Sequence, residues 1–276
     1  MGKFEGHALP GTFMLTFGTW WAFAAWRNYF RSREQKRHYA CRCSYAMPCL
    51  CRRFNFEGIT KIVACSICVA NETRGIIQVG VTTERGYFDL MASSQHFSMY
   101  LFYVLSGVVD VMTSSGFPLP PYTDYVTLLL AVSVEGLLFH FHLHGRPPLD
   151  VLVHTLLVYT AVAWAACIVV EMCRPRSILA SLGRAYFCLL QGTWFWQVGY
   201  VLYSPLPEHP PWNVESHTDM MLAASVFSWH MMALLAYLGA LGIVAWAVNR
   251  TCGRWCGDDS AVVKEDDDLR QALVTG

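Results

Sequence analysis

Histidines and carboxylates gather at one short turn of an otherwise apolar chain. Residues 135–154 read EGLLFHFHLHGRPPLDVLVH, and strongly apolar stretches flank them on both sides. Burying a charged or unpaired polar group in such surroundings is costly, so these side chains need partners. Imidazole and carboxylate groups bind zinc, carry protons and form hydrogen bonds between membrane helices. The turn is therefore the candidate site of this chain.

Helical spacing places further polar residues on shared faces. Residues seven apart in a helix return to nearly the same face, and residues four apart are neighbours on it. Such spacings occur in three elements: Glu135 and His142; His96, Tyr103 and Asp110; Asp150 and His154. Three elements of the chain are therefore each predicted to present a polar stripe to the others.

We expect seven side chains to converge at one end of the folded chain as a candidate metal-ligand set: His96, Glu135, His142, His144, Asp150, His154 and His230. Three interpretations stay open. The set can form interhelical hydrogen bonds that fix the packing. It can bind a metal, for which zinc is the candidate given these ligand types. It can also line a proton or solute pathway.

The composition is that of a membrane protein. Of 276 residues, 54% are hydrophobic and 14% are charged, against roughly a quarter charged in an average soluble domain. We predict an all-α integral membrane protein, a bundle of seven transmembrane helices, from seven apolar stretches long enough to cross a bilayer. They lie at residues 9–29, 56–79, 94–114, 122–143, 149–173, 178–203 and 218–248. The second is the weakest, because it contains Glu57, Lys61, Glu72 and Arg74.

Basic residues set the expected orientation, because Lys and Arg near the ends of spans are retained in the cytoplasm. The stretch after the first span is rich in arginine, and the loops on the other side hold few basic residues. We therefore expect a lumenal or extracellular N-terminus and a cytoplasmic C-terminus, in the secretory pathway or the plasma membrane. Residues 1–250 form the membrane domain in this interpretation, and the acidic residues 251–276 form a disordered tail.

Four cysteines follow the first span: Cys41, Cys43, Cys49 and Cys51. Their C-x-C spacing is shorter than that of most zinc sites. Their position in a basic segment near the membrane favours palmitoylation over zinc, and plain free thiols are the remaining interpretation.

Five segments carry a resemblance to a known family: GHALPGTF (6–13), residues 95–111, residues 142–154, residues 190–203 and SWH (228–230). They resemble the transmembrane protein 45 family, which includes the epididymal transmembrane proteins. The resemblance implies seven spans and no established enzymatic activity. The family pattern falls here on Glu135, His142, His144, Asp150, His154, Trp229 and His230. His140 departs from the pattern, since the family tends to have an aromatic residue at that position.

We expect a non-catalytic protein of membrane organisation or trafficking. The alternative is a metal- or proton-linked activity of the polar cluster, either a zinc-dependent intramembrane hydrolase or a transporter. The expected partners are the lipid bilayer, a cytoplasmic protein bound by the acidic tail, and a second copy of the chain, with no nucleic acid. A retinal protein is disfavoured, because the last span has no lysine for a Schiff base.

Overall fold

The computed structural model describes residues 4–45, 55–78, 84–141, 143 and 145–252. Within these ranges the chain folds into helices alone, which confirms the all-α prediction. The helices are α1 (Phe4–Glu34), α2 (Phe56–Gln78), α3 (Glu84–Ser114), α4 (Thr123–Phe141), α5 (Pro148–Cys173), α6 (Ile178–Tyr203) and α7 (His217–Cys252). The acidic tail from residue 253 onward, together with Cys49, Cys51, His142 and His144, lies outside the described residues.

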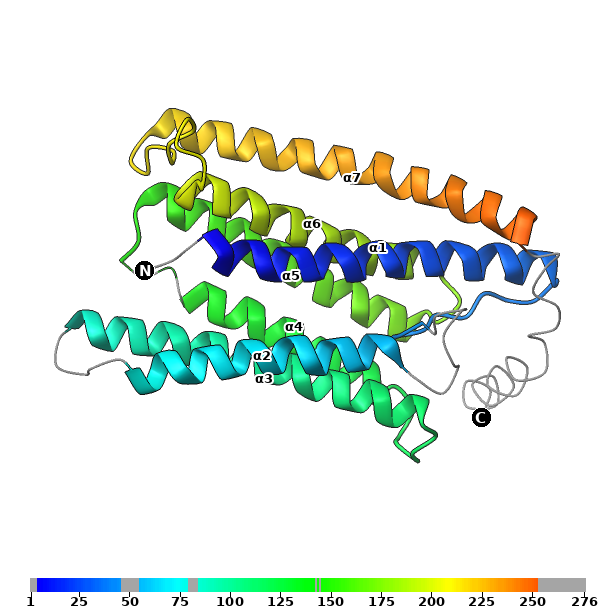
Figure 1. Cartoon of the computed structure of the whole chain (residues 1–276). Coiled ribbons are helices and arrows are strands. Elements are labelled where there is room, and N and C mark those ends of the chain that lie inside the picture. Colours follow the sequence, from blue (N-terminus) through cyan, green and yellow to red (C-terminus); the bar gives the residue numbers. More distant parts are fainter. Residues whose placement is uncertain (1–3, 46–54, 79–83, 142, 144, 253–276) are drawn as a thin grey trace.

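The helices lie side by side along one long axis, and successive helices run in opposite directions (Figure 1). We call the end where α1, α3, α5 and α7 begin the first end of the bundle. The other end, where α2, α4 and α6 begin, is the second end. This alternation gathers the starts of the odd-numbered helices with the ends of α2, α4 and α6, where most histidines of the chain lie.

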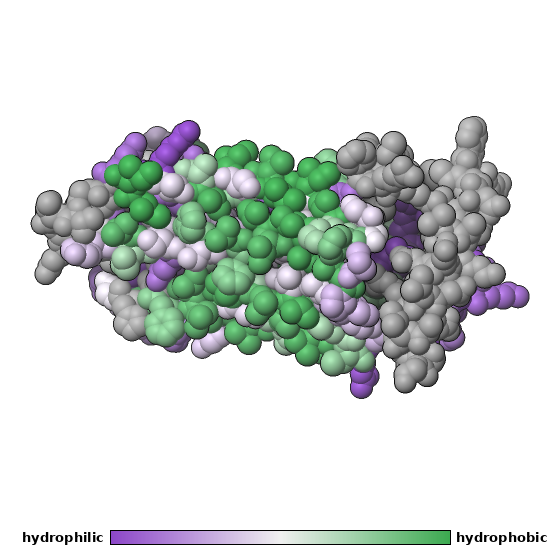
Figure 2. Space-filling view, turned by 90° about the horizontal axis from the view of Figure 1, so that it is seen from below, coloured by the Kyte–Doolittle hydropathy of each residue, from purple (hydrophilic) through white to green (hydrophobic). Residues whose placement is uncertain are grey.

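Four helices are long and apolar enough to cross a membrane by length and composition: α3 from Asp89, α4, α5 and α7 to Thr251. Figure 2 shows a broad apolar band across the middle of one face, with hydrophilic residues toward its ends. Large apolar side chains point outward within the described helices, among them Leu105, Leu137 and Ile243. Lipid is the environment in which such a surface is stable. The chain is an integral, multi-pass membrane protein.

Helix α6 is the central helix of the bundle. It packs against α1, α5 and α7, and more of its residues are buried than of any other described helix. Because protein rather than lipid surrounds it, α6 can carry Arg184 and Gln191, both buried. This explains how α6 can carry such residues although it lies among the candidate spans.

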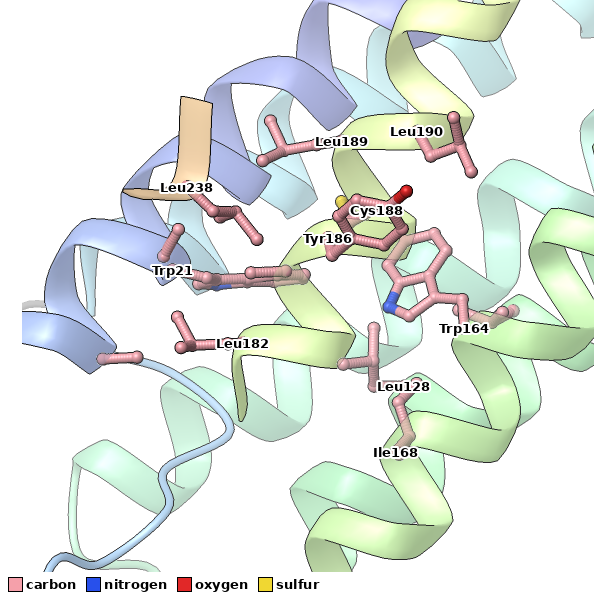
Figure 3. Close-up of a cluster of buried hydrophobic side chains, with 14 of the residues drawn as sticks. Trp21, Leu128, Trp164, Ile168, Leu182, Tyr186, Cys188, Leu189, Leu190 and Leu238 are labelled. Carbon is pink, nitrogen blue, oxygen red and sulfur yellow. The ribbon is translucent and has the colours of Figure 1, made fainter. Parts of the chain in front are cut away.

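The apolar core is built around α6 and combines aliphatic with aromatic side chains. Side chains of α1, α4, α5, α6 and α7 meet there, including Trp21, Leu128, Trp164, Leu189 and Leu238 (Figure 3). Helices α1 and α6 approach closely where Gly11 faces Gly192: a Cβ on Gly192 would lie 2.9 Å from the Gly11 carbonyl oxygen. Small residues at helix contacts in membranes allow this kind of approach.

The segment that follows α1, residues 39–45, folds into the second end of the bundle. Arg184 donates hydrogen bonds to the backbone carbonyls of Arg42 and Cys43, at 2.8 and 3.1 Å, and its Nε lies 2.6 Å from Glu171. Its guanidinium also lies over the ring of Trp21, 4.4 Å from the centroid. A buried arginine thus holds the segment against α5 and α6.

The folded segment buries two of the four cysteines in the palmitoylation hypothesis. The Cys41 and Cys43 side chains are 4% and 1% exposed. Burial raises the pKa of the Cys41 thiol to about 12, helped by the nearby charge of Glu171, so little thiolate forms at neutral pH. Acylation of Cys41 or Cys43 would require the segment to leave the bundle. The palmitoylation hypothesis therefore concerns Cys49 and Cys51.

Helix α2 is formed over its predicted length, and two of its charged residues point inward. Lys61 Nζ lies 2.6 Å from Asp110 of α3, with both side chains buried. Glu57 accepts hydrogen bonds from the indole nitrogens of Trp20 and Trp21, at 2.5 and 2.9 Å. Two of the charges that weakened the sequence prediction of this span, Glu57 and Lys61, are thus the groups that join α2 to its neighbours.

Candidate functional site

A cavity of about 370 Å³ opens at the first end of the bundle. It reaches from Glu5, which is exposed, to Glu135, which is 2% exposed. Residues from α1 to α6 line it: Glu5, Gly6, His7, Pro10, Met14, Glu72, Asp89, Ala92, Ser93, His96, Met99, Tyr100, Tyr103, Glu135, Phe139, Arg146, His154, Phe195 and Tyr203. Its volume is within the range of small-molecule sites.

Glu135 lies deepest among the ionisable groups of this cavity. It is six residues before the end of α4, which is about 9 Å along the helix axis. Tyr103 of α3 donates a hydrogen bond to Oε2 at 2.5 Å, and Gln191 of α6 donates one to Oε1 at 3.0 Å. Both donors are neutral, so hydrogen bonds hold the carboxyl group in place without an adjacent cationic side chain.

A second acidic group holds the histidine of α5. Asp150 accepts two hydrogen bonds from Arg146, at 2.9 and 3.0 Å, and its Oδ1 lies 2.7 Å from Nδ1 of His154. The backbone carbonyl of Asp150 is 2.9 Å from the same nitrogen, which favours a proton on Nδ1. In that tautomer, Nε2 of His154 has the lone pair and can accept a hydrogen bond. The His7 ring packs edge-on against His154, with centroids 5.7 Å apart.

The rim of the cavity carries a weaker pair. His96 Nδ1 of α3 lies 3.5 Å from Glu72 of α2, and both side chains are partly exposed, at 38% and 24%. Surface pairs of this kind contribute little to stability. Their position instead adds titratable groups where the cavity meets solvent.

The structure brings part of the predicted set together. His96, Glu135 and His154 line the cavity, and Asp150 contacts His154 as the four-residue spacing predicts. His230 lies apart, against the Trp194 ring, with centroids 5.7 Å apart. His230 is not among the described residues that line the cavity, and its place in a ligand set stays a prediction. Within the described residues, no three His, Cys, Asp or Glu side chains are close enough to hold one metal ion. Since His142 and His144 lie outside those residues, zinc binding stays a prediction.

Three residues of the site were missing from the predicted set. His7 carried a signal, because it begins the first span at the same end as the other histidines. Gln191 was a polar residue in an apolar stretch, but its pairing with Glu135 spans 56 positions and no local pattern reveals it. Arg146 sits four residues before Asp150, a spacing that favours an ion pair on a helix.

Comparisons with known proteins agree with this membrane architecture. The profile of a family of unknown function (DUF716) matches residues 123–242, from the start of α4 into α7. Human transmembrane epididymal protein 1 is 27% identical over 154 residues, 55% of each chain, so the match spans about half of that relative. The rat protein of the same name is 24% identical over 88% of this chain and 81% of its own. Mouse transmembrane epididymal protein 1A is 22% identical over the same shares. The chain is thus similar, over most of its length, to membrane proteins named as transmembrane epididymal proteins.

Proposed function

We propose that this chain is a seven-span membrane protein with a proton-linked activity. In this proposal the N-terminus is lumenal or extracellular and the C-terminus is cytoplasmic. The cavity then opens to the lumen, and Glu135 takes up and releases protons through it. A role in packing alone, as in the trafficking hypothesis, would need no cavity beside this carboxyl group.

The arrangement of the helices supports seven spans. Every described helix runs along the bundle axis (Figure 1), and α2 and α6 turn polar side chains inward, where Glu57, Lys61 and Arg184 are buried. The arginines at the end of α1 lie at the second end, which the distribution of basic residues assigns to the cytoplasm.

Tags on the two termini test this topology. We expect the C-terminal tag to be accessible to antibody only after the plasma membrane is permeabilised, and the N-terminal tag to lie on the opposite side of the membrane. A glycosylation acceptor placed in the loop between α6 and α7 serves as an independent marker of the lumenal side. Both tags on one side would contradict a crossing by seven helices.

The observation that carries the proton-linked function is the position of Glu135. Ionisable groups inside the membrane are costly and mark ion or proton pathways. This one is buried, meets the cavity and has neutral hydrogen-bond donors. Either a proton or a cation from solution can therefore neutralise it.

The route from solution to Glu135 is lined by groups that exchange protons. Protonation removes the charge of Glu135, so low lumenal pH favours the neutral form and high pH favours the anion. The titratable or charged groups that line the same cavity are Glu5, His7, Glu72, Asp89, His96, Tyr100, Tyr103, Arg146, His154 and Tyr203.

Infrared spectroscopy of the protein in lipid tests the assignment. We expect a carboxylic C=O stretching component that grows reversibly as the pH falls from about 9 to 6, above the range in which exposed carboxylates titrate, and that is missing in Glu135→Gln. Glu208→Gln is the matched control, because Glu208 is exposed in the loop between α6 and α7 and does not line the cavity. The spectrum of the Glu208→Gln variant should keep the titrating C=O band. The same band in Glu135→Gln, or no titrating band in the unchanged protein, would overturn the proposal.

A further inference from the structure

We propose that the cavity binds a small organic cation, an ammonium with an apolar body, whose charged nitrogen contacts Glu135. This inference rests on the proposed function, since a proton and the ammonium would neutralise the same carboxylate in turn. The protein would then exchange protons for amines at one site.

The first argument is the contrast between Glu135 and two other buried carboxylates of the bundle. Asp110 lies 2.6 Å from Lys61, and Glu171 lies 2.6 Å from Arg184. The described residues give Glu135 no such basic partner, only the hydroxyl of Tyr103 and the amide of Gln191. A buried carboxylate is stable when a cation pairs with it. Here the open cavity leads to the carboxylate, so the cation can come from solution.

The charge of the cavity lining is the second argument. Four carboxylate side chains line it: Glu5, Glu72, Asp89 and Glu135. Among its described lining residues Arg146 is the only lysine or arginine, and Asp150 accepts two hydrogen bonds from its guanidinium. The local field therefore attracts cations and disfavours anionic solutes.

The size and the lining of the cavity favour an organic ammonium over a metal ion as its ligand. Metal sites need several ligating side chains around one point, and the described residues provide no group of three. The cavity volume of about 370 Å³ fits a small organic molecule instead. Met99, Phe139 and Phe195 supply apolar surface near Glu135, and tyrosine rings favour a nearby ammonium group. The expected ligand therefore combines a charged ammonium group with an apolar body.

Three matched probes test the inference on the purified full chain: benzylamine, benzyl alcohol and benzoate. We expect benzylamine to bind in calorimetry at pH about 8, where a primary amine carries its proton. The alcohol and the carboxylate should not bind at the same concentrations. Glu135→Gln should weaken benzylamine binding at least about 30-fold, because the charged partner is lost. Glu208→Gln should bind as the unchanged protein does.

A second variant keeps the test decisive if Glu135→Gln does not fold. Ala92 lines the cavity nearer its rim, so Ala92→Phe should reduce benzylamine binding by filling space without changing charge. Benzylamine affinity should also fall as the pH decreases, since protons compete for Glu135. Equal binding of benzyl alcohol, or unchanged benzylamine affinity in Glu135→Gln, would overturn the inference. A retained infrared band of Glu135 would then show that the proton-linked proposal stands without the amine.

Discussion

Replacing Arg184 by methionine is expected to destabilise the folded chain by about 3–5 kcal/mol. The side chain is fully buried and joins three parts of the molecule: Glu171 of α5, the carbonyls of Arg42 and Cys43, and the ring of Trp21. Methionine fills similar space but leaves the Glu171 carboxylate in the interior without its cation. The segment 39–45 also loses two hydrogen bonds that hold it at the second end.

Unfolding of the purified protein in detergent, by heat or by a denaturing detergent, measures this effect. Arg176→Met is the matched control, because Arg176 is exposed in the turn before α6, and its stability should stay unchanged. The double variant Arg184→Met with Glu171→Gln should recover part of the loss, since it removes the unpaired charge. A single variant as stable as the unchanged protein would show that the buried pair does not hold this end together.

The Lys61→Met variant is expected to lose a similar amount of stability, about 3–5 kcal/mol. Lys61 and Asp110 pair at 2.6 Å between α2 and α3, and the second carboxylate oxygen of Asp110 has no hydrogen-bond partner within the described residues. Without the ammonium group, the Asp110 carboxylate would remain buried with no cation beside it. The destabilisation should appear first as separation of α2 from α3.

Cysteine crosslinking between α2 and α3, combined with thermal unfolding, measures both effects. Arg74→Met provides the control, because Arg74 lies on α2 and is exposed. Asp110→Asn added to Lys61→Met should restore part of the stability. If Lys61→Met and Arg74→Met unfold at the same temperature, the ion pair makes no net contribution to the fold.

The helices were largely predictable because apolar stretches of about 20 residues have few alternatives in a bilayer. The positions of the helix ends were less predictable from the sequence. The third helix begins at Glu84, ten residues before the predicted start at residue 94, because the polar residues there continue a helix beyond the apolar stretch. The Asp150 and His154 contact followed from spacing within a single helix, where geometry is fixed by the backbone.

Contacts between distant helices were not predictable in the same way. His230 and Glu135 looked equivalent as polar residues in apolar spans, yet one packs on Trp194 and the other meets the cavity. The rotation of each helix about its axis decides between these outcomes, and packing against neighbours sets that rotation. Arg184 illustrates the same limit, since its partners in the segment 39–45 are more than 140 positions away.

The buried pair between α2 and α3 constrains how the chain is made. During synthesis Glu57 can meet the tryptophans of α1 at once, because α1 precedes it. The carboxylate that pairs with Lys61 comes later, since Asp110 is 49 residues further along the chain. In the seven-span arrangement proposed above, a lone α2 would expose its ammonium group to lipid, which the translocation machinery resists. In that arrangement α2 and α3 are expected to enter the bilayer together as a hairpin, because the ion pair between them neutralises both charges.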